Sequence, residues 1–160
     1  MSMSKQEKEI SPKENDILVE TRKNGVTTLR MNRPKQLNGW TTPMMLAIKL
    51  AFKRLSTDSE TKVAILTGSD PYYCAGVNFA SLPLMHPQKL HDYILKNNAA
   101  IFDAFIDFPK PLMVAANGPA IGACVTSATL CDAIIASEKA TFSTPFARLG
   151  ERLLCNVYGS

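Results

Sequence analysis

Runs of apolar residues, separated by turn signals, divide this sequence into alternating strands and helices. The continuous apolar run from Leu112 to Ala116 is typical of a strand buried on both faces. Asn24-Gly25 lies between two other runs and predicts a hairpin turn. The remaining strands are predicted at 17–21, 26–31, 62–67, 133–136 and 140–143.

Two stretches carry apolar residues at the spacing of an α-helix. Each opens with a proline, Pro43 in the first and Pro87 in the second, and proline favours the first turn of a helix. Strands that alternate with helices predict an α/β fold. The predicted buried faces are Met44, Met45, Ile48, Phe52 and Leu55 in the first helix, and Leu90, Ile94, Ile101, Phe105 and Phe108 in the second.

The segment from 110 to 130 predicts a strand, a turn and a helix in succession. Asn117-Gly118-Pro119 ends the strand, and the small residues of 120–130 suit a buried helix. The start of such a helix has N–H groups without partners, so a ligand oxygen that becomes negative would be stabilised there.

Composition indicates one modest domain with a hydrophobic core. The chain has 160 residues, of which 46% are hydrophobic and 20% charged, and its formal net charge is +4. Its basic residues are scattered, which does not favour nucleic-acid binding, although a mild positive field suits a small phosphate-bearing molecule. Residues 1–16 are predicted to form a flexible polar tail without a signal peptide. The uncharged stretch 111–131 is interrupted by the turn and by polar residues, so we expect no membrane span.

The cysteines and histidines give no clear sign of a catalytic or metal site. Cys74, Cys124, Cys131 and Cys155 do not have metal-ligand spacing, and we interpret them as reduced, mostly buried thiols of an intracellular protein. The histidines, His86 and His91, are predicted to lie on the surface at the start of the second helix.

Two glycine-containing turns follow predicted strands and are the first candidates for chemistry. They are C-A-G-V-N-F at 74–79 and G-P-A-I-G-A at 118–123. Each could expose a backbone N–H, at Val77 and at Ala123, and two such donors aimed at one point form an oxyanion hole. The alternative is that the glycines serve only tight turns, because glycine motifs alone are weak signals.

These segments resemble the crotonase superfamily of enoyl-CoA hydratases and isomerases, and within it the Δ3,Δ2-enoyl-CoA isomerases of the peroxisomal and mitochondrial type. The resemblance covers about 17–150 and is carried by N-R-P (32–34), L-T-G (66–68), Y-Y-C-A-G-V-N-F (72–79), F-P-K-P (108–111), N-G-P-A-I-G (117–122) and A-T-F-S-T-P-F-A-R-L-G (140–150).

The resemblance implies a spiral of β-β-α units followed by a C-terminal helical region that supports homotrimers. The last ten residues do not resemble the family, so we expect a C-terminally truncated chain that lacks this region. We divide the chain into a tail at 1–16, a crotonase-like acyl-CoA-binding core at 17–150 and a divergent tail at 151–160.

The resemblance also implies a substrate and its site. The thioester carbonyl of a fatty enoyl-CoA or acyl-CoA would lie between the N–H groups of Val77 and Ala123, and Lys35 would meet a CoA phosphate. No metal or redox cofactor is implied, and the location would be the peroxisome or mitochondrion, with the cytoplasm as the alternative because no targeting signal is visible. The other implied substrate-binding residues are Ala75, Gly76, Asn78, Phe79 and Gly122.

The carboxylate that the family's isomerases use as a base is not at its matching position. That position, four residues after Leu149-Gly150, is Leu154, and Glu151 is the nearest carboxylate that could replace it. The hydratase glutamates match Thr126 and Phe146, which cannot act as carboxylate bases. We therefore expect a weak or inactive enoyl-CoA isomerase-like protein of fatty-acid β-oxidation. The alternative is a non-catalytic acyl-CoA-binding or partner-binding isoform that associates with full-length subunits.

Overall fold

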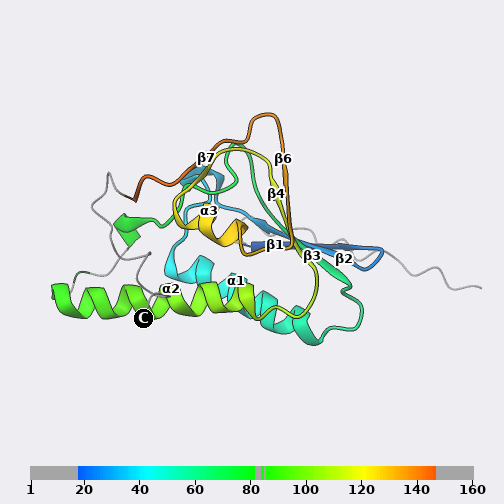
Figure 1. Ribbon diagram of the computed structural model, residues 1–160, viewed down its shortest axis with the longest axis horizontal. Coiled ribbons are helices and arrows are strands. Elements are labelled where there is room, and N and C mark those ends of the chain that lie inside the picture. Colours follow the sequence, from blue (N-terminus) through cyan, green and yellow to red (C-terminus); the bar gives the residue numbers. More distant parts are fainter. Residues whose placement is uncertain (1–17, 82–83, 85, 147–160) are drawn as a thin grey trace, which may run out of the picture.

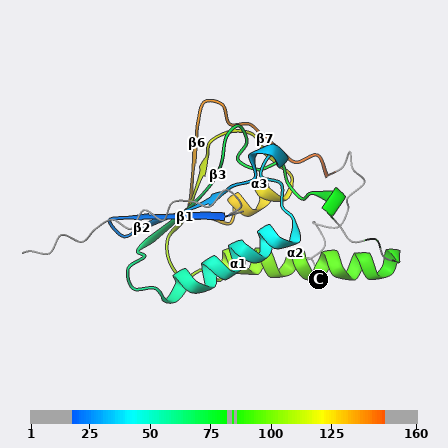
Figure 2. The same cartoon turned by 180° about the vertical axis from the view of Figure 1, so that it is seen from behind.

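A computed structural model describes residues 18–81, 84 and 86–146, and in it a twisted five-stranded sheet packs against helices (Figures 1 and 2). The first two strands form an antiparallel hairpin, and every later pairing in this sheet is parallel. Helices provide the crossovers, as parallel pairing requires. The strand order is β1 (Leu18–Lys23), β2 (Val26–Met31), β3 (Val63–Gly68), β4 (Leu112–Ala116) and β6 (Ala133–Ala136).

Both long helices have the predicted proline in their first turn, and a side chain caps each of them. The hydroxyl of Thr41 accepts a hydrogen bond from the N–H of Met44 at the start of α1 (Thr42–Thr57). Nδ1 of His86 accepts one from the N–H of Gln88 at the start of α2 (Pro87–Ile106). The two helices lie side by side on one face of the sheet (Figures 1 and 2).

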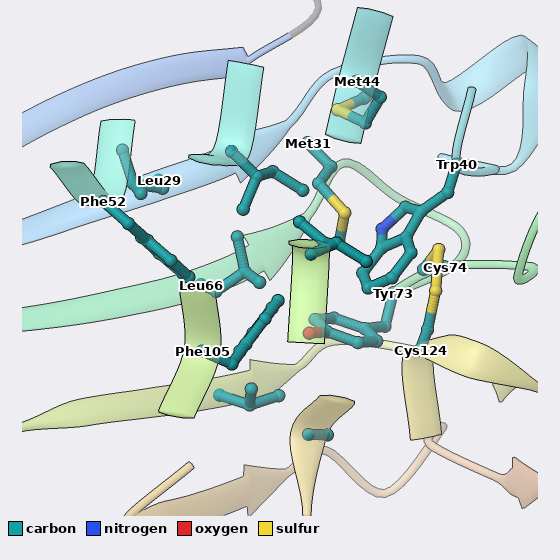
Figure 3. Packing of buried hydrophobic residues seen from close by; sticks show 14 of the residues in the cluster. Leu29, Met31, Trp40, Met44, Phe52, Leu66, Tyr73, Cys74, Phe105 and Cys124 are labelled. Atoms are coloured by element: carbon teal, nitrogen blue, oxygen red, sulfur yellow. A yellow bond between two sulfur atoms is a disulfide. The ribbon is translucent and has the colours of Figure 1, made fainter. Parts of the chain in front are cut away.

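The hydrophobic core lies between the sheet and these helices (Figure 3). Leu29 and Leu66 of neighbouring strands are fully buried, and the rings of Phe52 and Phe105 meet edge to face with centroids 5.0 Å apart. All five predicted core residues of α1 are buried, but of the α2 stripe only Ile101 and Phe105 are. The other members, Leu90, Ile94 and Phe108, are half-buried.

The predicted helix at 120–130 is wrong in its extent. Ala120–Ile121 is instead a short strand, β5, which pairs with β7 (Phe142–Ser143), and α3 covers only Ala123–Ala128. This backbone pairing fixes 120–121 in an extended conformation, which overrides the helical preference of alanine. Two 3-10 turns complete the described elements, η1 (Pro34–Gln36) and η2 (Phe79–Ser81).

The α/β architecture predicted from the sequence is confirmed. The predicted tails at 1–16 and 151–160 lie outside the described residues, as do Glu151, Leu154 and Cys155. Among the helices within the described ranges, none combines the length and the apolar character needed to cross a bilayer.

Candidate functional site

The two glycine turns predicted to carry chemistry lie against each other. The N–H of Cys74 donates to the carbonyl of Pro119 at 3.3 Å, and the N–H of Ile121 donates to the carbonyl of Cys74 at 3.0 Å. Segments almost fifty residues apart in the sequence are therefore joined by backbone hydrogen bonds just beyond the carboxyl ends of β3 and β4. In parallel sheets this is the edge at which ligands bind.

Gly76 is required for the close approach of the two turns. Its φ is +85°, and a β-carbon added there would lie 2.7 Å from the carbonyl oxygen of Ile121. Any other residue would be strained both by the backbone angle and by this contact. The glycine thus allows the turn at 74–77 to contact the turn at 120–123.

The N–H of Val77 points out of its own turn. The carbonyl of Gly76 accepts a hydrogen bond from the N–H of Trp40 at 2.7 Å. In a trans peptide the carbonyl and the following N–H point in opposite directions, so the N–H of Val77 faces away from Trp40. Within the described part of the chain this N–H has no hydrogen-bond acceptor.

The N–H of Ala123 has a similar arrangement at the start of α3. Gly122 adopts φ 63° and precedes the helix, and its carbonyl accepts from the N–H of Val125 at 2.9 Å. The opposite end of the same peptide, the N–H of Ala123, therefore points away from the helix. It too has no acceptor among the residues described here.

The other predicted binding residues lie around these turns. Ala75 is half-buried and its N–H donates to the carbonyl of Leu37 at 3.0 Å, which ties the turn to the loop that carries Lys35. Lys35 itself is exposed in η1. Asn78 is half-buried, whereas Phe79 is 53% exposed. The structure thus places all of these residues on connected segments around the two turns.

Comparison with known proteins identifies the family of the chain. The sequence profile for "Enoyl-CoA hydratase/isomerase" matches residues 21–153. The chain belongs to the enoyl-CoA hydratase/isomerase family. It is 41% identical over 143 residues to human "Enoyl-CoA delta isomerase 2", covering 85% of this chain and 35% of the relative. It is 38% identical over 139 residues to mouse "Enoyl-CoA delta isomerase 3, peroxisomal", covering 85% and 43%.

A solved structure of the family shares the fold. The enoyl-CoA hydratase from Mycobacterium avium subsp. paratuberculosis superposes with a TM-score of 0.72 at 30% identity, covering 84% of this chain and 52% of that one. The chain therefore spans between a third and about half of the length of these family members.

Thr126 and Phe146, which the sequence resemblance implies as counterparts of family carboxylates, are both described by the structure. Thr126 is half-buried on α3. Phe146 lies beside Gly122, where an added β-carbon would be 3.8 Å from its Cε1 atom. An aromatic ring at this point makes the surroundings of the turn apolar and can neither take nor give a proton.

Sequence reasoning missed a disulfide that joins the two turns. The prediction of reduced thiols is wrong for Cys74 and Cys124: both are buried, as expected, but their sulfur atoms are bonded (Figure 3). Cys131 is free and half-buried. The two bonded cysteines are 50 residues apart, so only the contact between the turns could have revealed the pair.

Asn38 is a second residue whose role the sequence did not reveal. It is buried with φ 55°, and its Nδ2 donates to the carbonyls of Ser69 and Tyr72, both at 2.7 Å. Its Oδ1 accepts from the N–H of Arg33 at 2.9 Å. Asn38 therefore holds the loop of Lys35 against the segment that leads into the turn at 74–77.

Two buried or half-buried groups near the site, the Tyr73 phenol and the Cys131 thiol, have a raised pKa. Burial raises the pKa of the Tyr73 phenol, whose hydroxyl has no hydrogen-bond partner in the described residues. Burial, helped by the nearby charge of Asp132, raises the pKa of the Cys131 thiol to about 12. Neither group can serve as a base near neutral pH.

A pocket of about 210 Å³ lies elsewhere, between α1 and α2, and includes none of the predicted site residues. It is smaller than the roughly 300–1,000 Å³ of typical ligand sites. Among the described residues no group of three or more metal-ligating side chains is clustered. We therefore place the candidate site at the two turns.

Proposed function

We propose that this chain binds a fatty enoyl-CoA or acyl-CoA at the two glycine turns. The N–H groups of Val77 and Ala123 would donate to the thioester oxygen. One observation carries the proposal: both N–H groups point out of turns that are hydrogen-bonded to each other. Donors fixed in this way stabilise the negative oxygen that forms when a proton leaves C2 of the acyl chain.

The surrounding residues would bind the rest of the substrate. Ala75, Gly76, Asn78, Phe79 and Gly122 would line the acyl-CoA site. The ammonium of Lys35 is exposed on a loop tied to Ala75, which suits contact with a CoA phosphate. We propose no metal or redox cofactor, because the CoA thioester itself supplies the acidity at C2.

The chemistry would be that of an enoyl-CoA isomerase, with low turnover. A base must take a proton from C2 of a 3-enoyl-CoA and return it at C4, which gives the conjugated 2-enoyl-CoA. The resemblance implies that Leu154, Thr126 and Phe146 stand where relatives keep carboxylates, so only Glu151 remains close in sequence as a candidate base. Since loss of a general base typically lowers rates by about 10²–10⁴, we expect turnover at least about a thousandfold below that of a complete family member such as human enoyl-CoA delta isomerase 2.

Formation of the 2-enoyl-CoA, followed by ultraviolet absorbance, tests this expectation. Glu151→Gln is the informative variant. Loss of a measurable rate in this variant would assign the base to Glu151. Rapid turnover that Glu151→Gln leaves unchanged would contradict our placement of the active site.

Replacing Ala123 tests the oxyanion hole directly. Ala123→Pro removes the N–H at the first residue of α3, a helix position where proline is tolerated. In whatever activity the chain has, loss of one such donor is expected to lower the rate about 10²–10³-fold. Ala123→Gly keeps the donor and is the matched control. Equal rates for the two variants would rule out a role for this N–H.

The second candidate function is that of a non-catalytic isoform that binds acyl-CoA or associates with full-length isomerase subunits. Exposed apolar residues on β6 and β7, among them Ile135 at 61% and Phe142 at 46%, favour a partner surface. Retention of an acyl-CoA without product would support it. For either function we propose a peroxisomal or mitochondrial location, with the cytoplasm as the alternative. The name of the mouse relative supports the peroxisome.

A further inference from the structure

Cys74 and Cys124 connect the two turns of the candidate site, and the isomerase chemistry uses neither of them. Both side chains are fully buried, and their Cα atoms are 6.1 Å apart, within the range of roughly 4.4–6.8 Å that a disulfide requires. Cys74 lies two residues before Gly76, and Cys124 directly follows Ala123. The link therefore joins the two chain segments that carry the N–H donors (Figure 3).

The sulfur of Cys74 has a second neighbour, which only the reduced form can use. It lies 3.1 Å from the carbonyl oxygen of Asn38. A thiol can donate a hydrogen bond to this oxygen, whereas a disulfide sulfur has no hydrogen to donate. The same sulfur therefore has a partner in both states: Cys124 when oxidised and the loop that carries Lys35 when reduced.

We propose that Cys74 and Cys124 form a redox-sensitive brace that holds the two turns together and so sets the affinity of the site for acyl-CoA. The part that concerns affinity rests on the proposed function, whereas the brace itself does not. When oxidised, the bond fixes the turns and the two N–H donors relative to each other. When reduced, the turns keep their backbone hydrogen bonds but separate more readily.

The proposed oxidant is a small disulfide of the glutathione type. The thiolate of one cysteine attacks the oxidised disulfide, which forms a mixed disulfide and releases one reduced thiol. The second cysteine then displaces the other reduced thiol and closes the protein disulfide. In total, two protein thiols and one oxidised disulfide give one protein disulfide and two reduced thiols. Both cysteines are buried, so exchange requires local opening of the turns.

The brace would act through preorganisation. Donors held in place before binding lose less freedom when the ligand arrives, so affinity rises without any new contact. We expect the oxidised chain to bind octanoyl-CoA about tenfold more tightly than the reduced chain, which is the effect of a modest gain in preorganisation. Cys124→Ser should bind octanoyl-CoA like the reduced wild-type chain, in oxidising and in reducing buffer alike. Cys131→Ser keeps the pair and should retain the full redox response.

The first test is peptide mapping of the full chain after equilibration in glutathione buffers of defined ratio. Free thiols are alkylated before digestion. A cross-linked peptide that contains Cys74 and Cys124, and that disappears as the buffer becomes more reducing, is the expected result. Absence of this peptide at every ratio would overturn the proposal.

The second test follows the amide hydrogen of Ile121, which donates to Cys74 across the turns. Its exchange should be about tenfold slower in the oxidised chain than in the reduced chain or in Cys124→Ser, because the bond limits local opening. Equal exchange rates would overturn the brace. Peptide mapping and amide exchange could both change with the redox state while octanoyl-CoA binds in neither state. In that case the brace stands and the proposed acyl-CoA site is wrong.

Discussion

The five-stranded sheet has two edge strands of opposite character. β1 carries charged residues along its length: Glu20 pairs with Arg54 of α1, and Arg22 pairs with Asp58 just beyond it. β6 reads A-I-I-A and has no charge, and Ile134 and Ile135 are 40% and 61% exposed. Both strands have one backbone edge without a strand partner in the described sheet.

This contrast separates a protected edge from an open one. Charged side chains on an edge strand discourage pairing with another chain, because they would have to be desolvated or brought close to like charges. An apolar edge offers unpaired backbone groups together with a hydrophobic surface. We therefore expect any association of this chain to occur at β6 rather than at β1.

The largest expected effect concerns the hydrogen bonds that hold the start of β6 in the sheet. The N–H of Leu112 donates to Oδ2 of Asp132 at 2.7 Å, and the N–H of Asp132 donates to the carbonyl of Leu112 at 2.9 Å. Asp132→Ala leaves the Leu112 N–H without an acceptor, so it should lower the free energy of unfolding by about 1–3 kcal/mol in urea denaturation. Glu20→Ala removes the surface ion pairs of Glu20 with Arg54 and Arg22 and should cost about 0–1 kcal/mol.

The control for this prediction is Asp132→Asn. Its amide oxygen can still accept the hydrogen bond, so most of the stability should remain. If Asp132→Asn were as unstable as Asp132→Ala, the charge rather than the hydrogen bond would hold β6. If Glu20→Ala were the more damaging change, the contrast between the two edges would be wrong.

Local sequence signals predicted most of the elements that form this sheet. The bounds of β2, β4 and β6 agree with the sequence prediction, α2 begins at the predicted Pro87, and α1 begins one residue before Pro43. Turn residues, prolines and apolar runs determine the backbone conformation within a few positions of themselves. The elements that they define can therefore be predicted from the local sequence. The family motifs likewise pointed to the two glycine turns, and the structure brings these turns together.

Features that depend on distant segments could not be predicted. The strand at Ala120–Ile121 exists because β7 and Cys74 pair with it, and the run of small residues gives no sign of this. The disulfide between Cys74 and Cys124 depends on the same contact. Exposure of β6 is a third case, because A-I-I-A is as apolar as the strand L-M-V-A-A beside it, and only the packing distinguishes them.

The second prediction tests β6 as the surface of association. We expect the chain to self-associate at micromolar concentration, or to need a partner, because this apolar edge is exposed. Ile135→Lys should raise the dissociation constant at least about tenfold, since burying a charge at the centre of a contact weakens it strongly. Analytical ultracentrifugation over a concentration series measures this effect.

Two results would contradict the second prediction. A wild-type chain that stays monomeric and unfolds cooperatively at these concentrations would show that the open edge does not associate. Ile106, at the end of α2, is 52% exposed and provides the matched control. If Ile106→Lys had the same effect as Ile135→Lys, the association would reflect general hydrophobicity rather than the edge of the sheet.

The smallest expected effect near neutral pH concerns Cys131, which precedes Asp132 just before β6. Burial and the charge of Asp132 raise the pKa of this thiol to about 12, from 9.0 in the absence of these effects. The folded state therefore keeps its proton at a pH where the unfolded state has lost it. Stability contributed by the neutral thiol is fully present below pH 9.0 and is lost as the pH rises toward about 12.

Cys131→Ala isolates this contribution from the other groups that titrate at alkaline pH. Urea denaturation of both chains between pH 8 and 11, in the presence of a reductant, should show a steeper loss of stability in the wild type. The difference between the two chains should grow with pH. Only the wild type must bind a proton at Cys131 when it folds at alkaline pH, and this proton becomes costlier to bind as the pH rises. If the unfolding free energies of the two chains fell in parallel with pH, the Cys131 thiolate would have to be solvated in the folded chain. The start of β6 would then be more open than the hydrogen bonds between Asp132 and Leu112 imply.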